Sequence, residues 1–355
     1  MNFLLIWLEA LTPKQALLMS KIAKLLIDSG FDILVTTRKY DYTVGIFNIH
    51  NVPAHIIGEY GGGSLEGKLR SSLERQIKLL NIVGVYKPDV HVSFTSPEST
   101  RVAFGLKIPI VLLTDTPHST PVNKLTIPLA EAVITPICTR NSWLKLGYNV
   151  DYFKFFDGIF EVAWILGFKP NKVVLANMNL KEYEYVIVRP EEKKASYYMS
   201  YANRYSEPTF FTAILDYVIN ELNLKVVFFP RYRDQLVFVK DRYGDSVLIP
   251  KESVDLQSLE AYARAIVTGG STIAVEGALQ GVPSVTLFPR RIETVDYLKK
   301  LGFPIFHIPV FSMDFRQVLN IVENAEQYRR NVHEILKNLE NPLPLIIDEI
   351  SRYKR

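Results

Sequence analysis

The sequence predicts an α/β protein made of two doubly wound, Rossmann-like domains that face each other across a cleft. Short apolar runs alternate with helical segments along most of the chain, which is the pattern of a parallel sheet covered by helices on both faces. The 355 residues are too many for one core and suit two domains of about 150 to 180 residues. The alternation stops between residues 157 and 170 and then restarts.

The first half of the chain predicts one complete sheet. Pro13 stands in the opening turn of the first expected helix and Gly30 follows its end, as helix boundaries prefer. The expected strands are 3–8, 31–37, 54–58, 90–95, 110–114 and 132–135. The expected helices are 13–29, 40–49, 65–86, 99–105 and 140–146.

The second half repeats the pattern. Its expected strands are 185–188, 225–229, 247–249, 265–268 and 284–288, and its expected helices are 209–222, 233–243, 256–263, 272–280 and 292–301. Charged helical segments over 314–339 and 343–355 complete the chain. We therefore expect domains at 1–165 and 166–340, with a C-terminal helix at 341–355 that packs back on the first domain.

Composition restricts the class of protein. A hydrophobic content of 48% with 22% charged residues is globular, and a net charge of +4 suits an enzyme of anionic small molecules better than a nucleic-acid binder. The single cysteine, Cys138, excludes an internal disulfide. No apolar run reaches eighteen residues, so we expect a cytoplasmic protein, at most peripheral to the inner face of the membrane.

Metal ligands are not grouped in the sequence. The six histidines lack ligand spacing, and no Asp-x-Asp motif is present to hold a divalent cation. We therefore expect no metal and no cofactor.

The stretch 268–283 predicts a phosphate-binding turn. Gly269 and Gly270 follow an apolar strand and allow a sharp turn, and Ser271 and Thr272 stand where a helix begins. A helix N-terminus carries unpaired N–H donors and about half a positive charge, which suits a diphosphate. Glu276, one turn further, could accept hydrogen bonds from sugar hydroxyls. The alternative is an ordinary packing turn between a strand and a helix.

Arginines follow several strands of the second half. Ligands of doubly wound sheets bind at the carboxyl ends of the strands, where guanidinium groups can hold phosphate in a bidentate manner. We expect Arg189 or Arg290 to contact a ligand phosphate, and solvated loop residues are the alternative. The arginines in such positions are Arg189, Arg231, Arg233, Arg290 and Arg291.

The strand ends of the first half carry candidate general bases instead. His118 is the preferred base because its ordinary pKa lies nearest neutrality, and Asp115 is close enough in sequence to orient it. Glu98 and Glu9 follow or end other strands. A structural histidine that caps a loop is the alternative for His118.

Two loops and one helix complete the candidates. Thr12 and the Gly61-Gly62 pair predict an acceptor-side surface or a lid, with a flexible surface loop as the alternative. The expected helix at 65–86 carries Lys68, Arg70, Arg75 and Lys78 on one face and apolar residues on the other. It could make a weak peripheral contact with an anionic membrane, or it could simply pack on the sheet.

The stretch 269–283 resembles the donor-nucleotide motif of GT-B glycosyltransferases. It is similar to the motif of the bacterial enzyme that makes lipid II and, more loosely, to that of the non-hydrolysing UDP-N-acetylglucosamine 2-epimerases. In those families the glycine turn binds donor phosphate and the helix glutamate binds ribose hydroxyls. The resemblance implies these roles for Gly269, Gly270, Ser271 and Glu276. The glycine-rich first loop of the lipid II enzyme is absent, so its acceptor is not implied.

Nearly the whole chain resembles the family called domain of unknown function 354, which implies a GT-B architecture and no settled reaction. The first loop departs from the family pattern, because Glu9, Leu11 and Gln15 stand where aspartate and histidine are usual. The residues that carry the resemblance are 12–13, 61–62, 87–89, 101–105, 115–118, 123–128, 168–170, 189–191 and 195–197.

Together these features predict a metal-independent GT-B glycosyltransferase. It would bind a nucleotide sugar in the second domain, use His118 or Asp115 to deprotonate an acceptor hydroxyl, and invert the anomeric centre. The acceptor, an unknown glycan or lipid, is not specified. One alternative is a sugar-nucleotide 2-epimerase that uses Glu98, Asp115 and His118, and a second is a nucleotide-sugar binding protein without catalysis.

Overall fold

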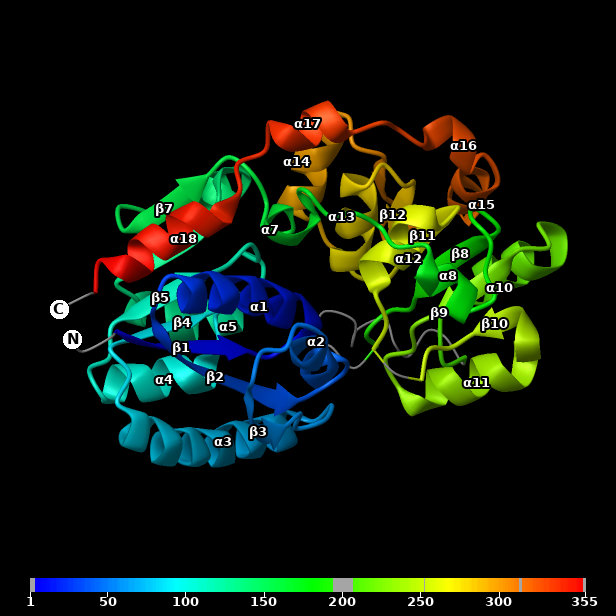
Figure 1. Ribbon diagram of the computed structural model, residues 1–355. Helices are drawn as coiled ribbons and strands as arrows, with labels where there is room; N and C mark the ends of the chain where they lie inside the picture. Colours follow the sequence, from blue (N-terminus) through cyan, green and yellow to red (C-terminus); the bar gives the residue numbers. More distant parts are fainter. Residues whose placement is uncertain (1–3, 194–206, 252, 313–314, 354–355) are drawn as a thin grey trace. The chain divides into compact units, whose positions relative to one another are not determined.

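The chain folds into two compact units, each built on a parallel sheet (Figure 1). The computed structural model describes residues 4–193, 207–251, 253–312 and 315–353. Unit 1 comprises Met1–Trp164 with Leu339–Arg355, and unit 2 comprises Ile165–Asn338. Both sheets are parallel with intervening helices, so the fold class is α/β and Rossmann-like, as the alternation predicts.

The sheet of unit 1 has the strand order β3-β2-β1-β4-β5-β6-β7 over the described residues. Its chain begins in the middle, moves to one edge and then returns to build the other half, so the order reverses between β1 and β4. The strands are β1 (Leu5–Ala10), β2 (Asp32–Lys39), β3 (His55–Glu59), β4 (Val90–Ser93), β5 (Ile110–Leu113), β6 (Ala132–Pro136) and β7 (Phe153–Phe156).

Helices cover both faces of this sheet. Figure 1 shows α1 on one face and α3 on the other; α1 packs with α2 and α18, while α3 packs with α4. The α-helices of unit 1 are α1 (Pro13–Asp28), α2 (Thr43–Ile49), α3 (Leu65–Tyr86), α4 (Pro97–Gly105), α5 (Thr120–Thr126), α6 (Arg140–Lys145) and α18 (Pro342–Ser351), and α7 (Val162–Ile165) lies at the unit boundary.

The sheet of unit 2 has the strand order β10-β9-β8-β11-β12-β13. Strands β8 and β11 are neighbours at its reversal point, and every residue of both is buried. The strands are β8 (Tyr185–Arg189), β9 (Lys225–Phe228), β10 (Val247–Leu248), β11 (Ala265–Thr268), β12 (Ser284–Thr286) and β13 (Ile305–His307).

In the part of the chain that the structure describes, no helix of unit 2 is as long as α1 or α3 of unit 1. Helix α10 (Thr212–Asp216) continues as a π-helical stretch over Tyr217–Glu221. The others are α8 (Val173–Asn177), α11 (Arg233–Tyr243), α12 (Leu256–Tyr262), α13 (Thr272–Leu279), α14 (Glu293–Leu301), α15 (Phe315–Glu323), α16 (Ala325–Tyr328) and α17 (His333–Lys337).

The predicted elements match the observed ones closely, with six differences in the described residues. Helices α5, α7 and α8 and strands β7 and β13 were not predicted from the sequence, and the expected helix at 314–339 is three short helices. Residues 195–197, part of the family resemblance, lie outside the described residues. Over the described residues, no helix combines the length and the apolar character that crossing a bilayer requires.

Candidate functional site

Gly269 lies where two strand ends of unit 2 meet. The N–H of Gly269 donates to the carbonyl oxygen of Arg189 at 2.9 Å, which extends the pairing of β11 with β8 beyond the strand. A Cβ added to Gly269 would lie 2.5 Å from the Cα of Glu191. The two backbones therefore touch, and only glycine fits this position.

The next residue, Gly270, completes the turn. Its N–H donates to Thr268 Oγ1 at 3.1 Å, and its carbonyl oxygen accepts from Thr286 Oγ1 at 2.6 Å. A Cβ on Gly270 would lie 3.0 Å from Nη2 of Arg231, which places this guanidinium against the turn. Strand-end threonines thus fix the turn from both sides.

Helix α13 begins directly after the turn. Ser271 occupies the N-cap position, but its side chain makes no capping hydrogen bond. Ser271 and Thr272 are partly exposed, whereas residues 273–279 are all buried. The helix therefore presents an accessible first turn without a side-chain cap, which is the geometry that binds anions.

Two loops beside the turn are tied together by Gln235. Its Oε1 accepts from the N–H of Arg231 at 3.0 Å, and its Nε2 donates to the carbonyl oxygen of Glu191 at 3.2 Å. Arg231 Nε donates in turn to the carbonyl oxygen of Pro190 at 2.9 Å. Arg231 is therefore held next to the end of β8.

Glu191 is a fully buried carboxylate in this region. It accepts from Thr209 Oγ1 at 2.9 Å and from the N–H of Phe210 at 3.1 Å, and Lys193 Nζ lies 3.9 Å from it. Burial raises the pKa of Glu191 to about 7, although these partners act in the opposite direction. Glu191 can therefore gain or lose a proton near neutral pH.

The predicted phosphate-binding arginines differ in their surroundings. Arg189, at the end of β8, is 7% exposed, whereas Arg290, in the loop after β12, is exposed. Arg291 pairs with Asp296 at 2.5 Å. Arg189, through its backbone carbonyl, and Arg231, through its guanidinium, both lie against the Gly269–Gly270 turn.

Glu276 is turned toward α12. Its side chain is 1% exposed, and Oε1 accepts from Gln257 Nε2 at 3.2 Å. Burial, together with the nearby Glu276 carboxylate, raises the pKa of Glu260, which also accepts from Gln280 Nε2 at 3.2 Å. Glu276 thus belongs to a buried carboxylate pair between α12 and α13, and its contact with a ribose stays a prediction.

In unit 1, Asp115 belongs to a buried ion cluster. Lys14 Nζ, on α1, bonds to Asp115 Oδ2 and lies 2.7 Å from Glu161 Oε1. Burial alone disfavours the Lys14 ammonium, but the two carboxylates outweigh this effect and hold the pKa of Lys14 above its ordinary value. The cluster joins α1, the loop after β5 and the segment before α7.

His118 and Asp115 lie in the same loop, which connects β5 to α5. Asn123 Nδ2 supports this loop by donating to the carbonyl oxygens of Thr116 at 3.0 Å and Pro117 at 3.1 Å. The His118 ring is partly buried. Its Nδ1 atom is buried, and the bonds from Asn123 hold the loop that carries it.

A second buried network surrounds Glu9 at the end of β1. Glu9 accepts from Thr36 Oγ1, and Arg75 Nη2 on α3 lies 2.6 Å from Glu9 Oε1. Burial raises the pKa of Glu9, although Arg75 acts in the opposite direction. Ser96 Oγ lies 3.4 Å from both Glu9 Oε1 and Glu98 Oε2. Glu98 is therefore connected to Glu9 through the Ser96 hydroxyl, and it does not stand alone as a candidate base.

Gly61 and Gly62, predicted to lie on an acceptor side, each have a local structural reason. A Cβ on Gly61 would lie 2.5 Å from the carbonyl oxygen of Gly67, so the loop and the first turn of α3 touch through their backbones. Gly62 has a φ of +79°, which favours glycine. Thr12 precedes α1 in extended conformation without a capping bond.

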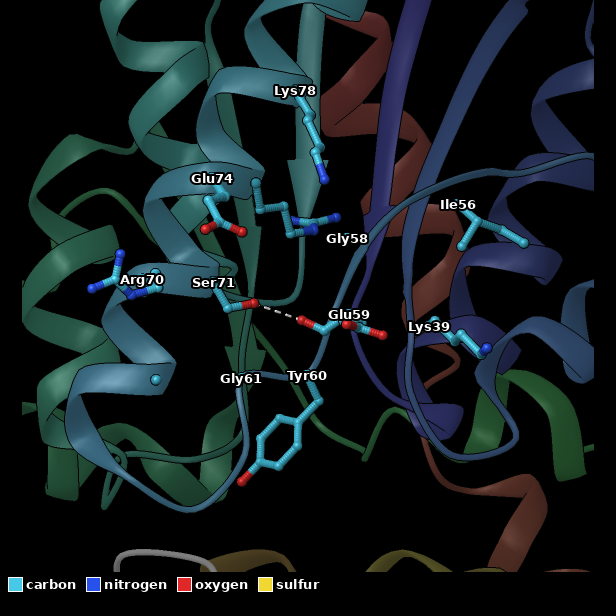
Figure 2. A pocket seen from close by; sticks show the side chains of 12 residues that line it. Lys39, Ile56, Gly58, Glu59, Tyr60, Gly61, Arg70, Ser71, Glu74 and Lys78 are labelled. Atoms are coloured by element: carbon cyan, nitrogen blue, oxygen red, sulfur yellow. Dashed lines mark hydrogen bonds between the residues drawn. The ribbon is translucent and has the colours of Figure 1, made fainter.

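A pocket of about 380 Å³ lies between α3 and the ends of β2 and β3 (Figure 2). Figure 2 shows Arg70, Ser71, Glu74 and Lys78 on the α3 side and Lys39 and Glu59 opposite them, with Tyr60 at one end. The Ser71 hydroxyl donates to the carbonyl oxygen of Glu59 at 2.7 Å. Gly61 also lines the pocket, whereas His118, Asp115 and Glu98 are not part of its wall.

Sequence reasoning missed the partners of these charges. Lys14, Glu161 and Glu191 were not proposed for the site. Arg75 was grouped with the other cations on the basic face of the helix at 65–86, although it is 2% exposed. A charged residue inside an apolar run was the available signal for Glu161, which lies between Phe160 and Val162. In the described residues, no group of three or more His, Cys, Asp or Glu side chains is placed to hold a metal ion.

The two sheets and their helices define a protein of GT-B fold, as comparison with solved structures shows. The UDP-GlcNAc 2-epimerase of Methanocaldococcus jannaschii, solved with UDP-GlcNAc and UDP, is 17% identical, with a TM-score of 0.73 over 99% of this chain and 100% of that one. MurG of Acinetobacter baumannii is 13% identical, with a TM-score of 0.55 over 99% and 100% of the two chains. At these identities the likeness shows the fold alone.

The chain belongs to the family described as protein of unknown function (DUF354), which matches residues 4–355. An uncharacterised protein of Methanocaldococcus jannaschii is 27% identical over 355 residues, which cover 98% of each chain. The resemblance drawn from the sequence motifs is thereby confirmed.

Proposed function

We propose that the chain is a glycosyltransferase that transfers a sugar from a nucleoside diphosphate sugar bound in unit 2. The observation that carries the proposal is the Gly269–Gly270 turn, which is backbone-packed against Glu191 and leads into the uncapped start of α13. Such a turn offers N–H donors and the positive end of a helix to a diphosphate. A protein of the same fold, the M. jannaschii epimerase, was solved with UDP-GlcNAc and UDP, which supports the choice of ligand.

Cationic side chains would stabilise the departing diphosphate. Arg231 lies against Gly270, and Arg189 ends the neighbouring strand. Guanidinium groups aimed at a leaving diphosphate lower the barrier to its departure, because they stabilise charge that develops in the transition state. The leaving group can therefore be stabilised by the chain's own residues.

The base of the proposed reaction is His118 of unit 1. An acceptor hydroxyl must lose one proton as it attacks the anomeric carbon, and an imidazole suits this step because its ordinary pKa lies near neutrality. Asp115 is held by Lys14, so its carboxylate is already engaged with a cation. Direct displacement by the activated hydroxyl would invert the anomeric centre.

A 2-epimerase is the second candidate, and a particular comparison favours it. The TM-score to the epimerase of M. jannaschii is 0.73 for one solved structure and 0.62 for another, against 0.55 to MurG. An epimerase needs acid and base groups but no acceptor, and Glu98, Asp115 and His118 would supply them. The Lys14 ammonium pairs with Asp115, and the Arg75 guanidinium pairs with Glu9. These ion pairs favour transfer over epimerisation, because a carboxylate paired with a cation is a poorer acceptor of a substrate proton.

One experiment separates the two reactions. The chain is incubated with UDP-N-acetylglucosamine alone and with the sugar nucleotide plus lipid and glycan extracts, and products are followed by NMR and by radiolabel transfer. The proposal predicts label transfer only when extract is present, and a loss of about 100-fold in rate for His118→Ala. His55→Ala, at an exposed histidine of the same unit, should keep the rate.

The other outcomes are equally informative. A 2-epimer formed without extract identifies an epimerase and contradicts the transferase proposal. Binding without any turnover in either incubation, across UDP, GDP, CDP and dTDP sugars, identifies a nucleotide-sugar binding protein.

A further inference from the structure

Helix α3 exposes a row of large apolar side chains. Leu65, Leu69, Leu73, Ile77 and Leu80 are 77%, 61%, 53%, 63% and 46% exposed. The residues of α3 that are buried are Arg75, Leu79 and Val83. The helix therefore packs on unit 1 through one side and leaves a second apolar side uncovered by the described chain.

The row is continuous along the helix. Its first four members recur every four residues, so each lies beside the next and the row turns around the helix by about 40° per step, while Leu80 continues it one turn further along. The 22 residues of α3 span about 33 Å. A contiguous apolar surface of this kind marks an interaction site on a soluble protein.

A second row of charged residues follows each of the first four apolar ones. Glu66, Arg70, Glu74 and Lys78 alternate in sign along the helix, and Arg70 and Glu66 are 3.3 Å apart. The charges of this row cancel. An anionic membrane would therefore be repelled by two members of the row, which argues against the membrane contact that the sequence left open beside packing on the sheet.

The alternating charges of this row are complementary to those of a second copy of α3 that runs antiparallel to the first. When a second copy of α3 is laid antiparallel about a two-fold axis near Ser71 and Ser72, Glu66 faces Lys78 of the second copy. Arg70 then faces Glu74 of the second copy, and the two reciprocal pairs repeat by symmetry. In a parallel arrangement every pair would be of like charge, which is unfavourable.

We infer that the apolar row of α3 is the interface between two copies of this chain, related by a two-fold axis that crosses the helix near Ser71 and Ser72. The interface is isologous, because the same surface is contributed by both copies. The apolar row forms its centre and the charged row its rim, as in other protein interfaces. This inference concerns assembly and is independent of the proposed function.

The first test is sedimentation equilibrium of the full chain and of Leu73→Glu. The unchanged chain should sediment as a dimer at micromolar concentration, and Leu73→Glu should raise the dimer dissociation constant by about 100-fold or more. Leu144→Glu is the matched control, since Leu144 is an apolar residue 45% exposed on α6, and it should dimerise as the unchanged chain does. Circular dichroism confirms that each variant is folded.

The second test is a charge exchange, which fixes the orientation. Arg70→Glu makes residue 70 of each copy face Glu74 of the other copy with like charge, in two symmetry-related pairs. It should raise the dimer dissociation constant about 10-fold. Arg70→Glu combined with Glu74→Arg restores opposite charges in both pairs and should recover most of this loss. The inference is overturned if the unchanged chain stays monomeric up to a concentration about 100-fold above the micromolar range, whether or not it sediments with anionic vesicles. It is also overturned if the double exchange does not recover dimerisation.

Discussion

At the scale of single residues, the proposed donor site depends on how closely two backbones approach. Gly269 and Gly270 are adjacent, and neither has the left-handed backbone that would itself require glycine. They differ in what surrounds them. The space beside Gly269 is filled by the backbone of Glu191, whereas the space beside Gly270 is bounded by the end of the Arg231 side chain.

The first prediction follows from this contrast. Gly269→Ala should lower the free energy of unfolding by about 2 kcal/mol or more, because the new methyl group meets a backbone that cannot move aside. Gly270→Ala should cost less than about 1 kcal/mol, because a flexible guanidinium can shift. Urea unfolding of both variants checks the difference. Equal losses would contradict the assigned packing of Gly269 against Glu191.

The sequence predicted the residues of this turn but not their partners. Gly269, Gly270 and Ser271 are consecutive, so their role can be inferred from local pattern alone. Glu191 precedes them by almost eighty residues, and nothing in the local pattern brings it to Gly269. Contacts that depend on strand order cannot be inferred from spacing.

At the scale of elements, a buried ion cluster joins three segments at the carboxyl edge of the unit 1 sheet. Lys14 belongs to α1, Asp115 follows β5, and Glu161 precedes α7. Each carboxylate is less than 7% exposed, and the ammonium lies between them. Removing the cation would leave two buried carboxylates facing each other.

The second prediction concerns this cation. Lys14→Met should lower the free energy of unfolding by about 3 to 5 kcal/mol, because the carboxylates lose their counter-ion. Lys24→Met, at an exposed lysine of the same helix, should change it by less than about 0.5 kcal/mol. Adding Asp115→Asn and Glu161→Gln to Lys14→Met should recover a large part of the loss. If the two lysine variants are equally stable in thermal unfolding, the ion cluster does not stabilise the fold and the prediction is wrong.

Element boundaries were predictable where local signals are strong. Helix α3 spans the predicted residues 65–86, with Ser64 accepting from the N–H of Gly67 at 3.0 Å and Lys87 ending the helix in left-handed conformation. The prediction that Arg75 belongs to a basic face of α3 was wrong, because its side chain points inward to Glu9 and to the carbonyl oxygen of Ile57. Strands β7 and β13 are four and three residues long, too short for a periodic signal.

At the scale of the whole molecule, the chain repeats one architecture in two units. Each sheet is parallel and reverses its strand order once, between β1 and β4 in unit 1 and between β8 and β11 in unit 2. The Gly269–Gly270 turn directly follows β11, while the two buried ion networks of unit 1 adjoin β1 and β5. The proposal accordingly assigns nucleotide binding to unit 2 and proton removal to unit 1.

The alternation of strands and helices was sufficient to predict this architecture. The reaction was not predictable in the same way, because GT-B proteins with the same sheets include both an epimerase and MurG. Fold and function are therefore separate conclusions, and the second depends on the ligand that the Gly269 turn receives.

The most direct test of the central claim is calorimetric titration of the chain with UDP, GDP, CDP and dTDP, repeated with Ser271→Asp and Ser271→Asn. Both side chains are good N-caps, so both variants should stay folded, but the aspartate adds a negative charge where the diphosphate would lie. The account predicts that at least one nucleotide binds, that Ser271→Asp weakens it about 10-fold or more, and that Ser271→Asn does so much less. Absence of binding by all four nucleotides, or equal affinity in the aspartate variant, would contradict a diphosphate site at the start of α13.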